Sequence, residues 1–394
     1  MYIYEPREDT ELILSQLKNY AKGNILDIGT GTGILAIAAA KVNIFNHVIG
    51  VDINDEALEC AKKQAEGLDN IQFIHSDLFE AFKGKEKKFD LVIFNPPYLP
   101  EEPEEDDDVK IALSGGKKGY EILERFFSEA SPYLMPYGKI LILFSTLTGR
   151  EKVHEIIERY GFSYQKITEE SFFQETLFVY LVEKSKFLLN LESKSMTNIE
   201  KLAKGHRGLI YTADLKGKKV AIKIKNPDSE AIGTILNEAR WLKVLNMKGI
   251  GPELLFHEDE MFCYNYIHGI FIEKFFQLEN KANIKKVIKD VFEQCFTLDS
   301  MQINKEEMHN PYKHVIVTQE KEPKSVLIDF ERMHPSEDPK NVTQFCQYVS
   351  SAKVLKILRQ KGFKIEKAKM ISAAKRYKKQ MNKGNLHGIF SIIR

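Results

Sequence analysis

The sequence is poor in cysteine, nearly neutral in charge and free of long apolar runs. Its cysteines form no CxxC pair and lie far apart, at Cys60, Cys263, Cys295 and Cys346. This spacing argues against a structural zinc site and suits a reducing compartment. The net charge of +1 gives no global bias towards nucleic acid or membrane surfaces. No apolar run approaches a membrane span and the first residues lack a signal-peptide core, so we expect a cytoplasmic protein without membrane contact.

The chain of 394 residues is longer than a typical domain, and its two halves follow different patterns. In the first half, short apolar strands alternate with helical segments. We expect strands at residues 24–28, 48–52, 71–74, 91–94, 139–144 and 176–182, and helices at residues 5–20, 34–41, 54–66, 119–134 and 151–160. This alternation predicts an α/β fold with a doubly wound, Rossmann-like parallel sheet, in which ligands bind at the carboxyl ends of the strands.

One of these strand ends carries two consecutive prolines. The apolar run at residues 89–94 is followed by Asn95, Pro96, Pro97 and Tyr98. Prolines have a fixed φ and no N–H, so this turn offers carbonyl acceptors without competing donors. A planar NH2 group could be held by the Asn95 side chain and the Pro96 carbonyl, with Tyr98 against its flat face. Such a site would orient a weakly nucleophilic amide or aromatic amine towards an electrophile.

The turn after the first strand is rich in glycine. It runs from Asp27 through Gly29 and Gly31 to Gly33, and glycine allows a ligand to approach the backbone closely. A dinucleotide-binding fingerprint would need a glycine where Ile34 stands. The observed DxGxGxG spacing instead resembles the S-adenosylmethionine (SAM) turn of class I methyltransferases. By that resemblance, the acid that ends strand two holds the ribose hydroxyls and the acid that ends strand three holds the adenine amino group.

Two further segments narrow the resemblance to one family. Residues 4–10 read YEPREDT, similar to the YEPxEDT opening of HemK-related protein glutamine methyltransferases of the eukaryotic and archaeal release-factor branch. Residues 113–120 read LSGGKKGY and are followed by RFF. This resembles that branch's DGGxxG…RFF segment, with Ser114 where an acid is usual. The ordered motifs cover residues 1–183, which we expect to form the methyltransferase domain.

The resemblance implies a SAM-dependent protein-(glutamine-N5) methyltransferase. Its substrate would be the Gly-Gly-Gln loop of a class I translation release factor, whose amide nitrogen would attack the SAM methyl group in line. The amide proton is lost late, so no strong general base is required. The cofactor-binding residues implied are Thr10, Asp27, Gly29, Gly31, Gly33, Asp52, Asp77 and Asn95, and the catalytic residues are Asn95, Pro96, Pro97 and Tyr98.

Other features bear on the substrate and on partners. The NPPY motif is shared with enzymes that methylate the exocyclic amine of adenine, so N6-methylation of RNA or DNA is the alternative. The acidic run at residues 101–108 would repel phosphate and suits a basic protein partner, although a solvated loop explains it equally well. The strand at residues 71–74 should lie at a sheet edge. The resemblance implies a small zinc-binding activator protein paired with this region.

After a charged stretch at residues 184–199, which we expect to be a linker, the pattern changes. A glycine loop precedes the strand VAIK, a glutamate lies on the next helix, and a later strand ends in IDFE. This order resembles a protein-kinase-like α+β domain at residues 200–350, similar to RIO-type and small archaeal Ser/Thr kinases. The resemblance implies binding of ATP and Mg²⁺ through Gly205, Gly208, Lys223, Glu238 and Asp329, with the metal on Asp329.

The catalytic loop of kinases, HxDxxxxN, is missing. In its place His309 stands where the base is usual and His314 where the second metal ligand is usual. An active Ser/Thr kinase, with an acid such as Glu307 substituting, and a nucleotide-binding pseudokinase are both compatible with this segment. If kinase activity dominates, the methyltransferase half would serve as a recruiting module.

The chain ends in a basic, helical tail at residues 351–394. We expect its helices to close the kinase-like lobe, with a solvated lysine face. Contact with RNA or the ribosome is the alternative.

Overall fold

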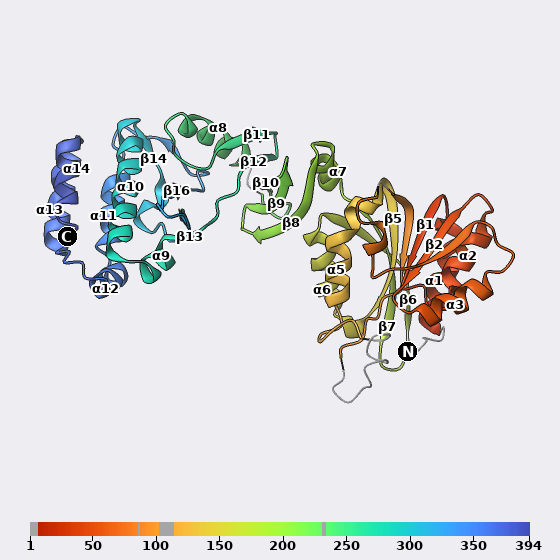
Figure 1. The fold of residues 1–394 in the computed structure, drawn as a ribbon. Helices are drawn as coiled ribbons and strands as arrows, with labels where there is room; N and C mark the ends of the chain where they lie inside the picture. Colours follow the sequence, from red (N-terminus) through yellow and green to blue (C-terminus); the bar gives the residue numbers. More distant parts are fainter. Residues whose placement is uncertain (1–6, 86, 102–113, 231–233) are drawn as a thin grey trace. The chain divides into compact units, whose positions relative to one another are not determined.

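The computed structural model describes residues 7–85, 87–101, 114–230 and 234–394 (Figure 1). The chain divides into two compact units, Met1–Lys201 with Ala213–Lys216, and Leu202–Thr212 with Gly217–Arg394. Each unit has its own hydrophobic core. Among the described residues, no helix combines the length and the apolar character that crossing a membrane requires.

The first unit is built on one seven-stranded sheet. Its strands are β1 (Asn24–Ile28), β2 (His47–Asp52), β3 (Ile71–His75), β4 (Phe89–Phe94), β5 (Leu134–Ser145), β6 (Phe162–Ser171) and β7 (Thr176–Lys184). They lie in the order β3-β2-β1-β4-β5-β7-β6, and β1 to β5 run parallel. The chain moves outwards in opposite directions from β1 and β4, so the carboxyl ends of these two strands form the switch point where ligands bind in such sheets.

Helices cover both faces of this sheet. They are α1 (Glu8–Tyr20), α2 (Ile34–Val42), α3 (Asp55–Gln64), α5 (Glu121–Ala130) and α6 (Arg150–Arg159), with short 3-10 turns at Glu80–Phe82, Ser131–Tyr133 and Thr146–Thr148. Ile93 of β4 packs in one core cluster with the apolar faces of α1 and α2. The next residue, Phe94, points to the opposite face, as strand geometry requires, and its ring stacks on Phe126 of α5 at 4.6 Å.

The sheet is mixed, which corrects the expectation of a parallel sheet. β7 runs antiparallel to β5, and β6 runs antiparallel to β7. The hairpin between β6 and β7 includes a hydrogen bond of 2.8 Å from the Phe172 amide to the Glu175 carbonyl. The sequence does not predict β6, because most of its side chains are partly or fully exposed and it therefore lacks an apolar pattern.

Residues 184–199 do not form the linker that their charged composition suggests. They contain helix α7 (Lys186–Ser193) and the start of strand β8 (Met196–Lys204). Leu188 and Leu191 are fully buried, three residues apart on one helix face. Burial of these two leucines stabilises the helix in a segment that a linker would leave solvated.

The second unit combines a small sheet with a helical part. A five-stranded sheet has the order β11-β12-β10-β9-β8, with β9 (Gly208–Leu215), β10 (Lys218–Lys225), β11 (Leu254–His257) and β12 (Met261–Asn265), beside helix α8 (Thr234–Asn246). The helices that follow are α9 (Ile272–Leu278), α10 (Lys281–Ser300) and α11 (Asn341–Val349). One short strand, β13 (Gly269–Phe271), precedes α9. Four more lie between α10 and α11, at β14 (Ile303–Asn304), β15 (Val315–Thr318), β16 (Ser325–Leu327) and β17 (His334–Pro335).

The basic tail is part of this second core. It forms α12 (Ala352–Gln360), α13 (Lys367–Lys379) and α14 (Lys383–Phe390). Tyr377 of α13 is buried, and its hydroxyl donates to the buried carboxylate of Asp299 on α10 at 3.0 Å. The tail therefore contributes to the stability of the unit, while the neighbouring Lys375 is exposed.

Candidate active site

The first unit contains a pocket of about 590 Å³ at the carboxyl ends of β1, β2 and β4. The pocket lies at the switch point of the sheet, as the fold predicts. Of the residues predicted to form a site, those that line it are Thr10, Gly29, Gly31, Asp52, Asp77, Asn95, Pro96, Pro97 and Tyr98. The structure therefore brings together residues from five separate parts of the sequence.

The glycine turn leaves open space at the pocket wall. Gly29 and Gly31 have φ of 64° and 54°, and a Cβ on either would meet no atom within 4 Å. Such conformations are accessible to glycine at little cost. Asp52 is fixed next to this turn, because its Oδ2 accepts a hydrogen bond of 2.8 Å from the Gly31 amide. Gly33 has another role: a Cβ there would lie 2.9 Å from the Ala61 Cβ, so it permits close contact between the turn and α3.

Asp27 lies beneath the turn and does not line the pocket. It is buried, and its Oδ2 accepts hydrogen bonds from the Thr30 hydroxyl at 2.7 Å and the Ala36 amide at 3.1 Å. Its other oxygen, Oδ1, is buried without a partner among the described residues. Burial raises the pKa of Asp27 to about 7. Asp27 therefore holds the glycine turn in shape from below.

Asp77 lines the pocket after β3 and forms an ion pair with Arg125 of α5. Arg125 is the first residue of the RFF segment. The ion pair therefore connects two segments on which the family resemblance depends. Both side chains are about half exposed.

The NPPY segment continues directly from β4. The Nδ2 atom of Asn95 donates a hydrogen bond of 2.8 Å to Oδ2 of Asp9 on α1. The Oδ1 atom of Asn95 is buried and has no partner among the described residues. The backbone carbonyl of Tyr98 accepts from the Thr148 hydroxyl at 3.1 Å, which fixes the end of the segment. Burial, with the charge of Asp9, raises the pKa of the Tyr98 hydroxyl, so Tyr98 is a neutral ring in this site.

Sequence reasoning missed three features of this pocket. Asp9 holds the side chain of Asn95, although in the sequence it resembles an ordinary acid in the first turn of a helix. Glu175 lines the pocket with a buried Oε2 that has no partner within the described chain. Phe172 and Phe173, at the β6–β7 tip, line the rim, and Phe173 is fully exposed. The only sequence signal for these two phenylalanines is an apolar pair in a polar segment.

The loop beyond NPPY is partly described. The acidic run at residues 101–108 lies, apart from Glu101, outside the described residues.

The segment that follows begins at Ser114. This serine replaces the acid usual in the family segment, and its Oγ accepts from the Gly116 amide at 3.1 Å. The Glu121 carboxylate accepts from the amides of Lys118 and Tyr120, each at 3.2 Å. These bonds cap the segment from Ser114 to Glu121 without the acid that is usual in the family.

In the second unit, the predicted lysine, glutamate and aspartate come together. The Lys223 ammonium lies 2.5 Å from the Glu238 carboxylate and 3.4 Å from that of Asp329. Burial alone would lower the pKa of Lys223, but these two carboxylates raise it above its ordinary value, so the lysine is charged. Asp329 has a φ of 63°, an unusual backbone conformation for a residue other than glycine. Burial opposes its ionisation, but His314, Lys223 and Lys305 hold the pKa of Asp329 below its ordinary value.

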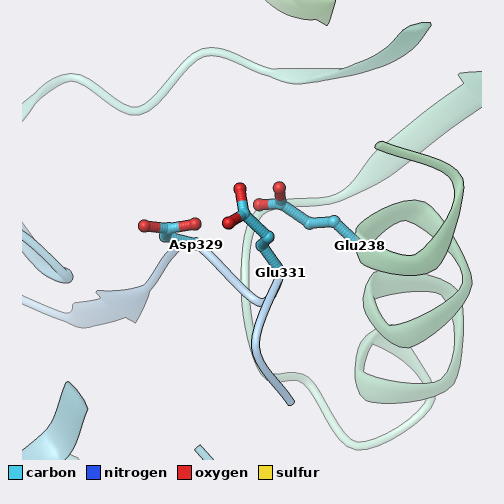
Figure 2. Close-up of side chains that lie close together, drawn as sticks. All are labelled: Glu238, Asp329 and Glu331. Atoms are coloured by element: carbon cyan, nitrogen blue, oxygen red, sulfur yellow. The ribbon is translucent and has the colours of Figure 1, made fainter. Parts of the chain in front are cut away.

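Glu331 is an additional acid at this site. Figure 2 shows Glu238, Asp329 and Glu331 converging, and one oxygen from each lies within 4.8 Å of the others. Arg207 from the predicted glycine loop pairs with Glu331.

The two glycines of this loop have separate roles. Gly208 lets the loop approach closely, because a Cβ there would lie 3.0 Å from Cε of Lys223. Gly205 is held by Asn226, whose Nδ2 donates to its carbonyl at 3.1 Å.

The segment that replaces the kinase catalytic loop contains a lysine that sequence reasoning missed. Lys305 is fully buried, donates to the Asp329 carbonyl and lies 3.9 Å from the Glu307 carboxylate. Burial lowers the pKa of Lys305. His314 lies 3.3 Å from the Asp329 carboxylate, whereas the ring of His309 is exposed beside the Glu306 carbonyl.

The sheet order, the glycine turn with its strand-end acid and the NPPY strand end together define a class I SAM-dependent methyltransferase. Residues 7–173 match the family model of the methyltransferase small domain. The chain is 43% identical over 163 residues to a putative protein N5-glutamine methyltransferase of Methanocaldococcus jannaschii, covering 41% of this chain and 81% of that protein. The chain therefore belongs to the HemK-type family of protein N5-glutamine methyltransferases.

Other proteins match at lower sequence identity. A release factor glutamine methyltransferase of Bacillus cereus is 34% identical over 170 residues, which are 39% of this chain and 59% of that protein. Among solved structures, the E. cuniculi Mtq2–Trm112 complex, responsible for methylation of the eRF1 translation termination factor, is 26% identical, with a TM-score of 0.37 over 47% of this chain and 100% of that one. The bifunctional kinase-methyltransferase WbdD is 13% identical, with a TM-score of 0.42 over 98% of this chain and 88% of that one.

Proposed function

We propose that this protein methylates the side-chain amide of a glutamine, in the Gly-Gly-Gln loop of a class I translation release factor, with SAM as methyl donor. One observation carries the proposal. The Oδ1 atom of Asn95 is a buried acceptor without a partner among the described residues, in the pocket that the glycine turn borders. An unpaired buried acceptor costs about 1–3 kcal/mol, and a primary amide is a ligand that would satisfy it. The names of the relatives support the choice of glutamine and of a release factor.

The residues of the pocket fit SAM and an amide substrate. The open space at Gly29 and Gly31 and the carboxylate of Asp52 suit the cofactor. Bound SAM would supply an electrophilic methyl group. The Asn95 Oδ1 and the Pro96 carbonyl would each accept one N–H of the substrate amide, while Tyr98 would restrict the amide plane. Because an amide nitrogen is a weak nucleophile, its orientation and the exclusion of water would account for most of the rate.

The test is methyl transfer from labelled SAM to a class I release factor. The wild-type factor is compared with its Gly-Gly-Gln to Gly-Gly-Ala variant, with and without the small zinc-binding activator. We expect label on the wild-type factor alone. Equal label on both factors would reject the glutamine as the acceptor.

The alternative substrate is the exocyclic amine of adenine in RNA or DNA, which presents a similar planar NH2. The acids around the pocket favour the protein substrate, because Asp9, Asp52, Asp77 and Glu175 all line it and would repel phosphate. If the release factor takes up no label while SAM still binds, adenine-containing oligonucleotides become the next acceptors to assay.

The edge strand β3 is the proposed docking site for the activator. β3 lies at the end of the sheet order, and Ile71, Phe73 and Ile74 on it are only partly buried. An edge strand with apolar side chains is a site for another chain to pair. If the purified chain is monodisperse and fully active alone, the activator proposal is wrong.

We further propose that the second unit is a kinase-like domain that binds ATP with Mg²⁺. The observation that favours it is the buried Lys223–Glu238 ion pair next to Asp329. In a kinase-like site, Lys223 would hold the α- and β-phosphates, Asp329 the metal, and Gly205 and Gly208 would cover the nucleotide. Phosphoryl transfer to a Ser/Thr substrate would need an acid at the position of the missing base. Glu307, with its side chain 20% exposed, is the residue to test.

A role in translation would place the protein in the cytoplasm, which agrees with its free cysteines Cys60, Cys263, Cys295 and Cys346. Contact between the basic tail and RNA is a secondary proposal, carried by exposed Lys375, Arg376 and Lys379. Because the tail contributes to a hydrophobic core, charge reversal of these residues tests RNA binding better than deletion does. Unchanged salt-dependent RNA binding after the reversal would reject the tail as an RNA site.

A further inference from the structure

We infer that Asp9 is a positioning residue that sets which end of the Asn95 amide faces the substrate. The inference rests on the proposed function and extends it to a residue of α1, far from the NPPY motif in sequence. Asp9 and Asn95 are 86 positions apart.

The contact between the two side chains has one chemically consistent orientation. Oδ2 of Asp9 lies 2.8 Å from Nδ2 of Asn95. An ionised carboxylate can only accept hydrogen bonds, whereas an asparagine amide presents acceptors at one end and donors at the other. The Asn95 NH2 group must therefore face Asp9. Its carbonyl oxygen is left as the buried acceptor without a partner among the described residues.

Asp9 is itself held in place. It is 4% exposed in the first turn of α1, where the helix dipole favours a negative charge. Its other oxygen, Oδ1, accepts a hydrogen bond of 2.7 Å from the Thr10 amide. One carboxylate oxygen is thus committed to the backbone, and the other is committed to Asn95.

This arrangement predicts a specific effect of replacing the carboxylate with an amide. In Asp9→Asn, the Thr10 amide still requires an acceptor, so the new NH2 group would point at Asn95. Two NH2 groups cannot share a hydrogen bond, so the Asn95 amide would turn over and present its donors to the pocket. The substrate NH2 would then meet donors in place of an acceptor.

The experiment measures kcat, KM and SAM affinity for Asp9→Asn, for Asn95→Asp and for the swapped double variant. We expect Asp9→Asn to lower kcat by roughly 10–100-fold, with SAM affinity changed by less than about threefold. The double variant exchanges the two groups and again leaves an acceptor facing the substrate. Its kcat should exceed that of Asp9→Asn by about tenfold or more, a coupling expected of residues in direct contact. Glu11→Gln removes an exposed acid from the same first turn of α1 and should leave kcat unchanged.

A wild-type kcat in Asp9→Asn would overturn the inference, as would a double variant no faster than either single variant. Loss of SAM binding in Asp9→Asn would also overturn it, because Asp9 would then serve the cofactor. A second measurement does not depend on the substrate. With ¹⁵N-asparagine labelling of the full chain, the Asn95 side-chain amide should show slow proton exchange in the wild type and fast exchange in Asp9→Asn. If the wild type methylates no glutamine, the proposed function fails, and this NMR comparison still decides the role of Asp9.

Discussion

At the residue scale, the methyltransferase pocket depends on groups that can accept hydrogen bonds but cannot donate them. The Asp9 carboxylate and the proline carbonyl can accept but cannot donate. Because Asn95 donates its NH2 group to Asp9, its carbonyl oxygen is the acceptor that remains for the ligand. We expect the orientation of one amide to matter more here than the total number of polar groups.

The first prediction concerns Asn95. Asn95→Ala removes the acceptor that would hold the substrate amide, so turnover should fall roughly 10²–10³-fold, the usual cost of losing one oriented polar group. Steady-state methyl transfer to the release factor measures it. Asn43→Ala, at an exposed turn, removes the same functional group away from the pocket and serves as the control. Wild-type turnover by Asn95→Ala would reject the assignment of the site.

The second prediction concerns Asp27 and pH. The pKa of Asp27 is raised from 3.8 to about 7 by burial, so between these two values the folded chain holds a proton that the unfolded chain has released. The contribution of this group to stability therefore decreases as pH rises from about 4 to about 7. Asp27→Asn cannot ionise, so its stability relative to the wild type should increase by roughly 2–4 kcal/mol between pH 5 and pH 8.

Urea unfolding at both pH values measures this difference. The transition of the first unit is the one that added SAM shifts, since a ligand stabilises the unit that binds it. Other titrating groups are shared by the two proteins and cancel in the comparison. A stability difference that stays constant from pH 5 to pH 8 would show that Asp27 is ionised throughout.

At the element scale, the β6–β7 hairpin places Phe173, a fully exposed phenylalanine, at the rim of the pocket. Burial of such a ring against a protein substrate would contribute about 1–2 kcal/mol. Phe173→Ala should therefore raise KM for the release factor by roughly 5–30-fold with little change in kcat. Tyr137→Ala removes another exposed aromatic side chain, 87% exposed on β5, and should leave KM unchanged. Equal KM values for the two variants would show that the tip does not contact the substrate.

Elements with a strong local pattern could be predicted from the sequence, and elements that depend on distant partners could not. The strands β1 to β5 and β7, and the glycine turn, follow from apolar runs and glycine spacing. The edge position of β3 was also correct. β6 was missed because its mostly polar side chains carry no pattern, and α7 was missed because Leu188 and Leu191 are few among charged residues.

The functional sites also divide into residues that a local motif predicts and residues that depend on distant partners. NPPY and the strand-end acids lie in recognisable local motifs, and the structure places them in one pocket. Asp9 could not be assigned, because its partner is 86 residues away and an acid in a first helical turn has an ordinary electrostatic explanation. Lys305 could not be assigned either, because a lysine is recognised as a site residue only when the positions of the acids around it in the fold are known.

At the scale of the whole molecule, two ligand sites in two units should be separable by single substitutions. Asp52→Ala should abolish SAM binding and leave binding of ATP with Mg²⁺ intact. Lys223→Ala should do the reverse, because it removes the cation next to Glu238 and Asp329. Titration calorimetry of the full chain measures both affinities. Lys219→Ala, on the same strand as Lys223 but exposed, is the matched control. ATP binding that survives Lys223→Ala would remove the reason to regard the second unit as kinase-like, whereas loss of both ligands in either variant would mean that the two sites depend on each other.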